Sequence, residues 1–437
     1  MARAHCIDLP RHFSELLSAK RLWGLARETK FVQRVGKINP FKLVFTLVLG
    51  FGAGSARNVS ALRREYERAS GVHLVPSAFY DRFGPQLVEF LRRVIAHLIE
   101  ATIAPVTRLG GALAGFRDLM IADASVLRLR DLLEKHFPAC RTNHTKAAAK
   151  LHMVLSATGL SSHTVAVTGE RVNDRHRLRI GPWVRDRLLL FDLGYYGFRL
   201  FDRIRRNGGY FISRFKSSGN PVIVKQHRRW RGRSVSVVGR KLKDVLSRLQ
   251  RQVLDVEVEV GFVRRSYGGH QRRAKTTFRL VGVRNEETGE YHLYITNVPP
   301  ERLTAEEVAL AYRARWEIEL LFKAWKTEFR LDELPSRKKE VVEALIYAAI
   351  ITMLLTRSLL ALLRAAAGDA AERVTAGRVV IMMRHLASFL LTLITAPSAD
   401  PGTARALRAL IAHEMVDPHR NRPNLLLQAS GIGPATA

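Results

Sequence analysis

Five short apolar segments in the middle of the chain constrain its fold more than any other feature. Each is bounded by turn residues, as strands are, and together they cover residues 119–123, 150–156, 164–167, 188–191 and 210–215. A helical segment, Phe198–Arg206, separates the last two. Three strands in succession, followed by strand, helix and strand, predict an α/β fold with a mixed sheet.

A β-rich stretch follows this segment and covers residues 217–297. Within it, residues 253–260 alternate between apolar side chains and mainly acidic ones such as Asp255. Because successive side chains of a strand point to opposite faces, this period of two predicts a half-buried strand. Two more strands are expected at 278–283 and 291–296.

Helical periodicity flanks the β segments on both sides. Apolar residues recur at spacings of three and four in residues 41–49 and 87–99, and the pattern is helical again from 338 onward. The uncharged run 344–356 is shorter than the roughly 20 residues that a membrane-spanning helix needs. We therefore predict a buried core helix there.

The N-terminal region has two further features. The glycine-rich run 50–54 superficially resembles a nucleotide-binding loop, but no strand precedes it, which argues against that function. Short helices expected at 59–69 and 77–83 carry several arginines. They form either a helix-turn-helix that docks on DNA or a plain helical bundle with a solvated basic face, and the residues concerned are Arg63, Arg64, Arg68 and Arg82.

The charge of the chain indicates a polyanionic partner. Lys plus Arg is 71 and Asp plus Glu is 39 among 437 residues, which gives a formal net charge of +32. The excess is spread from Arg21 to Arg422, so nucleic acid is the first candidate and an anionic membrane surface or ribosomal RNA the alternative. Two cysteines without a CxxC motif exclude a disulfide framework and a cysteine zinc site, and the charged N-terminus is unlike a signal peptide. A cytoplasmic protein without a membrane span is expected.

One predicted helix groups basic, acidic and aromatic side chains. Thr304 and Glu307 form a capping box that begins a helix expected to run from 305 to 330. At about 100° per residue, four of its residues share one narrow stripe, with Trp316 beside it: Tyr312, Arg315, Glu319 and Lys326. A carboxylate between two bases suits a metal ligand beside a phosphate, whereas the alternative is an amphipathic helix with ordinary ion pairs.

Two aspartates lie in or directly after apolar strands. Asp123 follows Ile121 and Ala122, and Asp192 directly follows the strand 188–191. A charged carboxylate beside a buried strand is costly unless it is paired or bound to metal, although Asp is also common in turns that end strands. Carboxylate ligands favour Mg²⁺ or Mn²⁺, and two such ions stabilise the attacking and leaving oxygens of phosphodiester cleavage.

These residues carry a resemblance to a known family. Asp123-Ala124-Ser125, Asp192-Leu193-Gly194-Tyr195, and Tyr312-x2-Arg315-x3-Glu319-x6-Lys326 together resemble the three motif regions of IS4-family transposases, the last being the YREK signature of that family. The segment 210–214, which ends in Arg214, resembles the strand after the second aspartate, and 293–299 resembles the approach to the last helix. The resemblance covers roughly residues 115 to 335.

The resemblance implies an RNase H-like catalytic core with a β-rich insertion before the last helix. Carried over by position, Asp123, Asp192 and Glu319 would bind two Mg²⁺ or Mn²⁺ ions. Contacts to transposon-end DNA would come from Tyr312, Arg315 and Lys326, with Arg214 and Trp316 also expected at the DNA. Some members of the family use tryptophans around a flipped base, and Trp316 could have this role. Trp230 is better explained as a surface or hydrophobic contact. Ala124 stands where Gly is more common in the family, which weakens the first motif.

We therefore expect an α/β protein with an RNase H-like mixed-sheet catalytic core, a β-rich insertion, and helical N- and C-terminal regions. The expected regions are a DNA-binding part at 1–110, the core at 111–216 and 298–335, the insertion at 217–297, and a helical part at 336–437 that serves dimerisation. The expected activity is cut-and-paste transposition on terminal inverted repeats and target DNA by a homodimer. The alternatives are a catalytically inactive DNA-binding protein of this fold and a nuclease without strand transfer.

Overall fold

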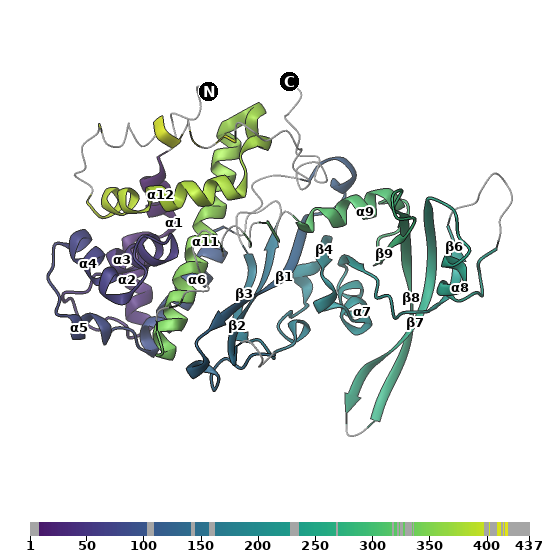
Figure 1. Ribbon diagram of the computed structural model, residues 1–437, viewed down its shortest axis with the longest axis horizontal. Coiled ribbons are helices and arrows are strands. Elements are labelled where there is room, and N and C mark those ends of the chain that lie inside the picture. Colours follow the sequence, from purple (N-terminus) through teal and green to yellow (C-terminus); the bar gives the residue numbers. More distant parts are fainter. Residues whose placement is uncertain are drawn as a thin grey trace.

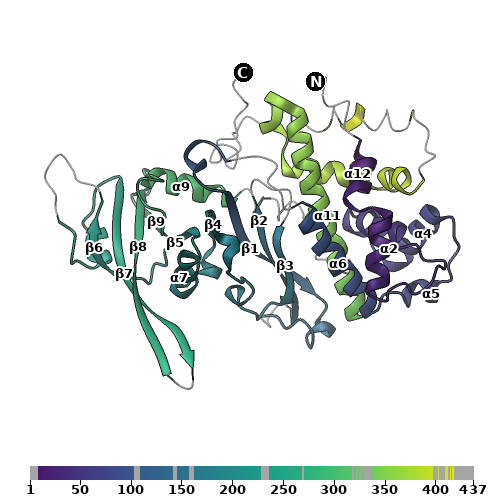
Figure 2. The same cartoon turned by 180° about the vertical axis from the view of Figure 1, so that it is seen from behind.

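A single mixed sheet runs through the molecule, with most helices gathered at one end and a long hairpin at the other (Figure 1). The computed structural model describes residues 8–102, 109–140, 145–156, 162–227, 236–267, 270–316, 319–320, 323, 327, 334, 336–396, 402, 409–411, 414 and 416–417. Figure 2 shows the same arrangement from behind.

Nine strands in the described residues form this sheet, in the order β3-β2-β1-β4-β5-β9-β8-β7-β6. Their bounds are β1 Asp118–Leu129, β2 Ala147–Ser156, β3 Ser162–Gly169, β4 Arg187–Phe191, β5 Tyr210–Arg214, β6 Val222–Gln226, β7 Val253–Tyr267, β8 His270–Arg284 and β9 Tyr291–Thr296. Neighbours are antiparallel except for β1, β4 and β5, which are mutually parallel. The predicted mixed sheet is confirmed, and its first five strands have the arrangement of an RNase H-like core.

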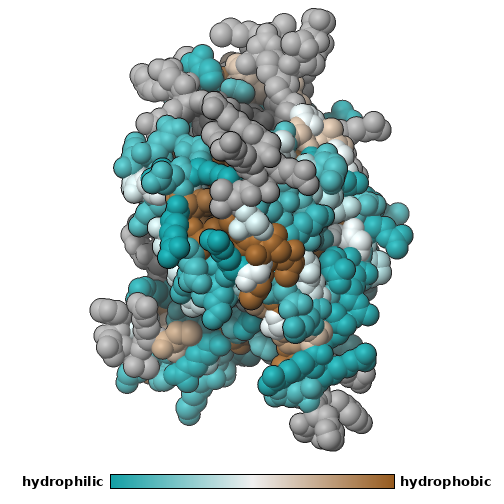
Figure 3. Space-filling view, turned by 90° about the vertical axis from the view of Figure 1, so that its right-hand side faces the viewer, coloured by the Kyte–Doolittle hydropathy of each residue, from teal (hydrophilic) through white to brown (hydrophobic). Residues whose placement is uncertain are grey.

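The β-rich stretch continues the core sheet instead of forming a separate one. β9 pairs with β5 on one side and with β8 on the other, so backbone hydrogen bonds run unbroken from the core to β6. The sequence did not predict β6, nor how far β7 and β8 extend, because residues past Val260 lose the apolar alternation. At the outer edge, Val222 and Val224 of β6 are each 40% exposed, and Figure 3 shows hydrophobic side chains gathered on this end of the molecule.

Alternating residues of the central strands divide the core into two layers. In β1, Leu119 and Ile121 face a large cluster shared with the N- and C-terminal helices. Met120 and Ala122 face a smaller cluster that includes the buried side of α7 (Phe198–Arg206). Each face of the sheet therefore packs against its own hydrophobic cluster.

The helical end is built around α11 (Lys339–Ala367), whose middle is buried. It packs against η2 (Thr46–Gly52), α6 (Pro85–Ala101) and α12 (Ala376–Thr395). By length and composition, α11 and α12 are two helices in the described part that would suffice to span a membrane. The packing of α11 confirms the predicted core helix. The remaining helices of eight or more residues at this end, among the described residues, are α1 Leu9–Leu16, α2 Ala19–Glu28 and α4 Val59–Ser70.

The glycine-rich run 50–54 serves packing. Following α3 (Pro40–Phe45), it lies at the end of η2, a short π-helix that approaches α11 closely. The Thr352 hydroxyl donates a hydrogen bond to the Val48 carbonyl at 2.9 Å, and a Cβ on Gly52 would lie 1.8 Å from that hydroxyl. A side chain at this position would therefore separate the two helices.

The two short helices expected in the arginine-rich part of the N-terminal region are present as α4 and α5 (Pro76–Tyr80). Arg63 donates to Glu67 at 2.6 Å and to the Leu74 carbonyl at 2.8 Å, and Arg68 pairs with Glu65. Two of the four arginines are thus engaged locally, while Arg64 and Arg82 are exposed. A DNA-docking motif and a plain helical bundle both stay open.

Candidate active site

The register of β1 and β4 places Asp123 beside Asp192. Ala122 pairs with Phe191 in the parallel ladder, so the next residue on each strand is an aspartate. β4 ends there, and Asp192 becomes the N-cap of the short helix η7 (Leu193–Tyr195). β1 continues beyond Asp123, so that carboxylate projects from the body of a strand, with Asp192 at the end of its neighbour.

Two buried tyrosines fix the backbone around these aspartates. The Tyr195 hydroxyl donates to the Asp123 carbonyl at 3.2 Å, and the Tyr312 hydroxyl donates to the Phe191 carbonyl at 3.1 Å. Burial raises the pKa of both phenols, that of Tyr312 to about 12, so both remain proton donors at neutral pH. The resemblance implies a phosphate contact for Tyr312, whereas here its hydroxyl is engaged with the backbone of β4.

The helix that carries Glu319 is interrupted, which corrects the prediction of one continuous helix from 305 to 330. The capping box of Thr304 and Glu307 is present, and α9 runs over Ala305–Arg313. The Ala314 amide bonds the Ala311 carbonyl three residues back, which tightens the chain into a turn. Residues 315–316, 319–320, 323 and 327 are helical again.

Glu319 is directed toward Arg315, one helical turn before it. Nη1 of Arg315 lies 2.6 Å from the Glu319 carboxylate, and the two side chains are 11% and 36% exposed. The guanidinium also lies 5.5 Å from the ring centre of Tyr312. Nε of Arg315 is buried and has no hydrogen-bond partner in the described part of the chain. The predicted grouping of Tyr312, Arg315 and Glu319 is therefore present despite the turn at Ala314.

The electrostatics of Asp123 show that the three carboxylates share one environment. The pKa of Asp123 is raised to about 6, mainly by burial and also by the negative charges of Glu319 and Asp192, against opposing contributions from the Ala124 amide and Arg315. No group of three His, Cys, Asp or Glu side chains with metal-binding geometry occurs among the described residues. The fold thus brings the three acids into one neighbourhood, with Glu319 held by Arg315.

The other predicted site residues differ in their placement. Arg214 ends β5, is exposed, and lies close enough to Tyr312 to oppose the rise in its pKa. Trp316 is 56% exposed, which leaves its indole available to a partner. Lys326 and Trp230 lie outside the described residues.

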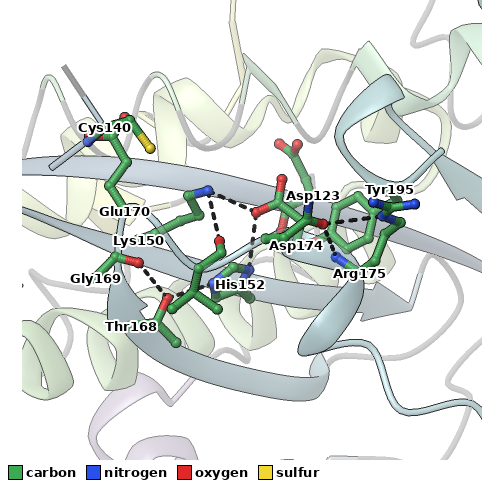
Figure 4. Close-up of polar contacts among 12 residues, drawn as sticks. Asp123, Cys140, Lys150, His152, Thr168, Gly169, Glu170, Asp174, Arg175 and Tyr195 are labelled. Carbon is green, nitrogen blue, oxygen red and sulfur yellow. Dashed lines mark hydrogen bonds and ion pairs between the residues drawn. The ribbon is translucent and has the colours of Figure 1, made fainter. Parts of the chain in front are cut away.

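A buried polar cluster next to this site was missed from the sequence. Nζ of Lys150 and Nδ1 of His152 lie 3.1 Å and 3.5 Å from the Asp174 carboxylate, and Nε2 of His152 lies 2.8 Å from the Thr168 hydroxyl (Figure 4). Burial lowers the pKa of His152 to about 4, so the imidazole is neutral at pH 7. Lys150 and His152 are two residues apart and hence on one face of β2. This spacing could have indicated a polar cluster, but the segment was interpreted only as an apolar strand.

The cluster supports the turn that follows Asp192. A Cβ built on Gly194 would lie 2.6 Å from Oδ2 of Asp174, so Asp174 occupies the space that a side chain there would need. Since Lys150 holds Asp174, the carboxylate has little freedom to retreat. The glycine of the Asp-Leu-Gly-Tyr motif is explained by this contact.

We expect Gly194→Ala to destabilise the protein by about 1–3 kcal/mol, because the new methyl group overlaps the Asp174 carboxylate. Urea unfolding followed by circular dichroism measures the change. In an Asp174→Ala background the same substitution should cost clearly less, and Gly377→Ala, where a Cβ meets nothing within 4 Å, is the matched control. Equal losses in both backgrounds would show that the contact with Asp174 is not the cause.

Comparisons with known proteins agree with this geometry. Residues 114–355, more than half of the chain, match the family described as Transposase DDE domain. The chain is 24% identical to the transposase for insertion sequence element IS231F of Bacillus thuringiensis subsp. israelensis, over 76% of each chain. It is 23% identical to the transposase for IS1151 of Clostridium perfringens, over 80% of each. A match of 36% identity to the putative transposase InsL of Escherichia coli covers 18% of this chain and 21% of that one. The chain belongs to the DDE transposase family.

Proposed function

We propose that this transposase excises and reinserts a DNA element by cleaving its ends and joining the 3′-hydroxyl strands to target DNA. The observation that carries the proposal is the common environment of Asp123, Asp192 and Glu319, which come from three separate segments. Relatives named as insertion-sequence transposases support it. Substrates would be terminal inverted repeats and target DNA.

The donor set of the site fits divalent cations. All three acids offer oxygen ligands, which favour Mg²⁺ or Mn²⁺ over zinc. A buried Asp123 with a raised pKa beside two more carboxylates is a group whose ionised form a cation would stabilise. When bound, two such ions stabilise the attacking and leaving oxygens of the displacement.

Metal binding would require Glu319 to leave Arg315, with which it is paired here. The released guanidinium, whose Nε already lacks a hydrogen-bond partner in the described part of the chain, would then be free for a DNA phosphate. Lys326, Arg214 and the exposed Trp316 are the further DNA contacts that we propose. Tyr312 would position β4 through its bond to Phe191.

We also propose roles for the flanking regions and the setting of the protein. The region 1–110 would bind the element ends, and 336–437 would support a homodimer, since joining two ends needs two active sites. Such a protein would work in the bacterial cytoplasm, on the nucleoid.

A test of the function uses the DNA that flanks the coding region. Purified protein, Mg²⁺ and a duplex with the flanking inverted repeats should yield nicked or excised ends and, with a target plasmid, joined product. Cleavage without joined product would identify a nuclease of this fold. Binding without cleavage, in Mg²⁺ and in Mn²⁺, would identify a DNA-binding protein that lacks activity.

We expect the affinity for element-end DNA to fall steeply with salt. Each phosphate contact made by Lys or Arg releases counterions, so the logarithm of the binding constant should fall by about 0.9 per contact for each tenfold rise in salt. Fluorescence anisotropy titrations between low and physiological salt measure the slope. A flat response would contradict phosphate recognition by this basic chain.

A further inference from the structure

The hairpin of β7 and β8 extends far beyond the rest of the sheet, as Figures 1 and 2 both show. β6 pairs with β7 only as far as Glu259, and β9 pairs with β8 only from Arg279 onward. Beyond these points the two strands pair with each other alone, out to the pair Tyr267–His270. Residues 261–267 and 270–277 thus form a two-stranded ribbon.

The ribbon carries positive charge without compensation in its own sequence. Residues 261–277 contain five basic residues and no Asp or Glu, the basic ones being Arg264, Arg265, Arg272, Arg273 and Lys275. Arg265 is the register partner of Arg272 in the ladder. Arg272 and Arg273 are exposed and have no ion-pair partner among the described residues. A polyanion would neutralise the charge of these two exposed arginines.

The first strand of the ribbon is fixed to the body of the protein. A bulge between Val263 and Arg265 leaves Arg264 unpaired in the ladder. Nε and Nη2 of Arg264 donate to the two oxygens of the buried Asp202 on α7, at 3.1 Å and 3.3 Å. Asp202 also accepts from Arg205. The ribbon therefore leaves the sheet in a direction set by this contact, with the exposed arginines of β8 presented to solvent.

We infer that this ribbon binds duplex DNA through its phosphate backbone, at a place remote from the scissile phosphate. A two-stranded ribbon fits the major groove of DNA, and exposed arginines on it suit the phosphates along the groove walls. The other explanation for basic residues here is protection of an unpaired strand edge from aggregation. Edge protection is served by charges of either sign, whereas residues 261–277 contain no Asp or Glu.

The strand register gives the distance from the chemistry. Leu190 of β4 pairs with a residue of β5, which pairs with Thr296 of β9, and Thr296 pairs with Arg279 of β8. Leu190 and Arg279 therefore lie at the same height across the sheet. β4 and β8 run in the same direction. Asp192 lies two residues after that height on the β4 side, and Arg272 lies seven residues before it on β8. The separation along the strands is therefore roughly 30 Å, about one turn of B-DNA. The inference rests on the proposed function for the choice of DNA as the partner.

The test compares two double variants of the full chain. In Arg272→Ala with Arg273→Ala, the dissociation constant for a fluorescent duplex at physiological salt should rise about 5- to 30-fold. The slope of its logarithm against log salt should decrease by about 1.8. Lys241→Ala with Lys243→Ala removes the same charge from exposed positions near α8 (Leu242–Leu246) in the same stretch, and should change affinity less than about twofold. Equal effects of the two variants would overturn the inference.

A crosslink separates DNA contact from contact with a second protein chain. Gln271→Cys, in a background with both natural cysteines replaced by serine, is labelled with a benzophenone and irradiated with the duplex. A protein–DNA adduct is expected, and a protein dimer without a DNA adduct would overturn the inference. If wild-type protein cleaves element ends while the Arg272 and Arg273 variant binds them normally, the ribbon inference fails and the proposed function stands. If wild-type protein binds no DNA, both fail.

Discussion

Replacing Glu319 with glutamine is expected to abolish DNA strand cleavage, with a loss of roughly 10³-fold or more in rate. The amide has almost the same size and shape, so packing against Arg315 is largely kept. It carries no negative charge, however, and cannot replace a carboxylate that holds a divalent cation. Asp192→Asn removes a charge from the neighbouring strand end and should have the same effect. Single-turnover cleavage of a labelled element end measures both.

Retained DNA binding distinguishes this result from misfolding. Both variants should bind the same duplex at least as tightly as the wild type, because the basic surface is unchanged and one negative charge is gone. Glu301→Gln, an exposed position just before α9, is the matched control and should cleave normally. Full Mg²⁺-dependent cleavage by Glu319→Gln or by Asp192→Asn would refute the role assigned to that residue.

Replacing Arg279 with methionine is expected to lower the free energy of unfolding by about 3–5 kcal/mol. Arg279 donates to both oxygens of Asp255, at 2.8 Å and 2.7 Å, and these side chains are 4% and 6% exposed. It also donates to the carbonyls of Val298 and Leu303, at 3.1 Å and 2.8 Å. Methionine would leave one charge and two carbonyls buried without these partners, and the segment leading into α9 would lose its attachment to the sheet.

An exposed pair on the same hairpin provides the control. Lys275 and Glu259 lie 2.8 Å apart but are 74% and 42% exposed, so Lys275→Met should cost less than about 1 kcal/mol. Chemical denaturation of both variants measures the difference. If Arg279→Met were combined with Asp255→Leu, part of the loss should return, because no charge would remain unpaired in the interior. A loss below about 1 kcal/mol for Arg279→Met alone would show that the buried pair does not anchor α9.

Much of the core could be predicted from local patterns. Strands such as β4 and β9 were predicted because short apolar segments between turn residues indicate a strand whatever surrounds them. The spacing of Arg315 and Glu319 placed them on one stripe of the helix, because four residues make about one helical turn. Their ion pair is the contact expected from the alternative, an ordinary amphipathic helix. The convergence of Asp123 and Asp192 was expected from their positions in the strands, and the parallel register supplied the detail.

What could not be predicted depends on partners distant in sequence. Asp255 was assigned to the polar face of a half-buried strand, and its burial with Arg279 depends on α9 packing over that face. The contact between Asp174 and Gly194 joins two loops that no local pattern connects. The turn at Ala314 could not be predicted either, because alanine by itself favours an uninterrupted helix.

The unbroken hydrogen-bonded sheet has a mechanical consequence. Many enzymes that act on long polymers attach an accessory module by a linker, and a hinge then lets the module search while the catalytic part stays in place. Here β9 is paired on both sides, so the described strands form one continuous sheet, without such a hinge, from β4 to the far edge. A long polymer bound at the far edge of this sheet reaches Asp192 at a constant distance. If the polymer does not match that distance, the polymer itself has to bend.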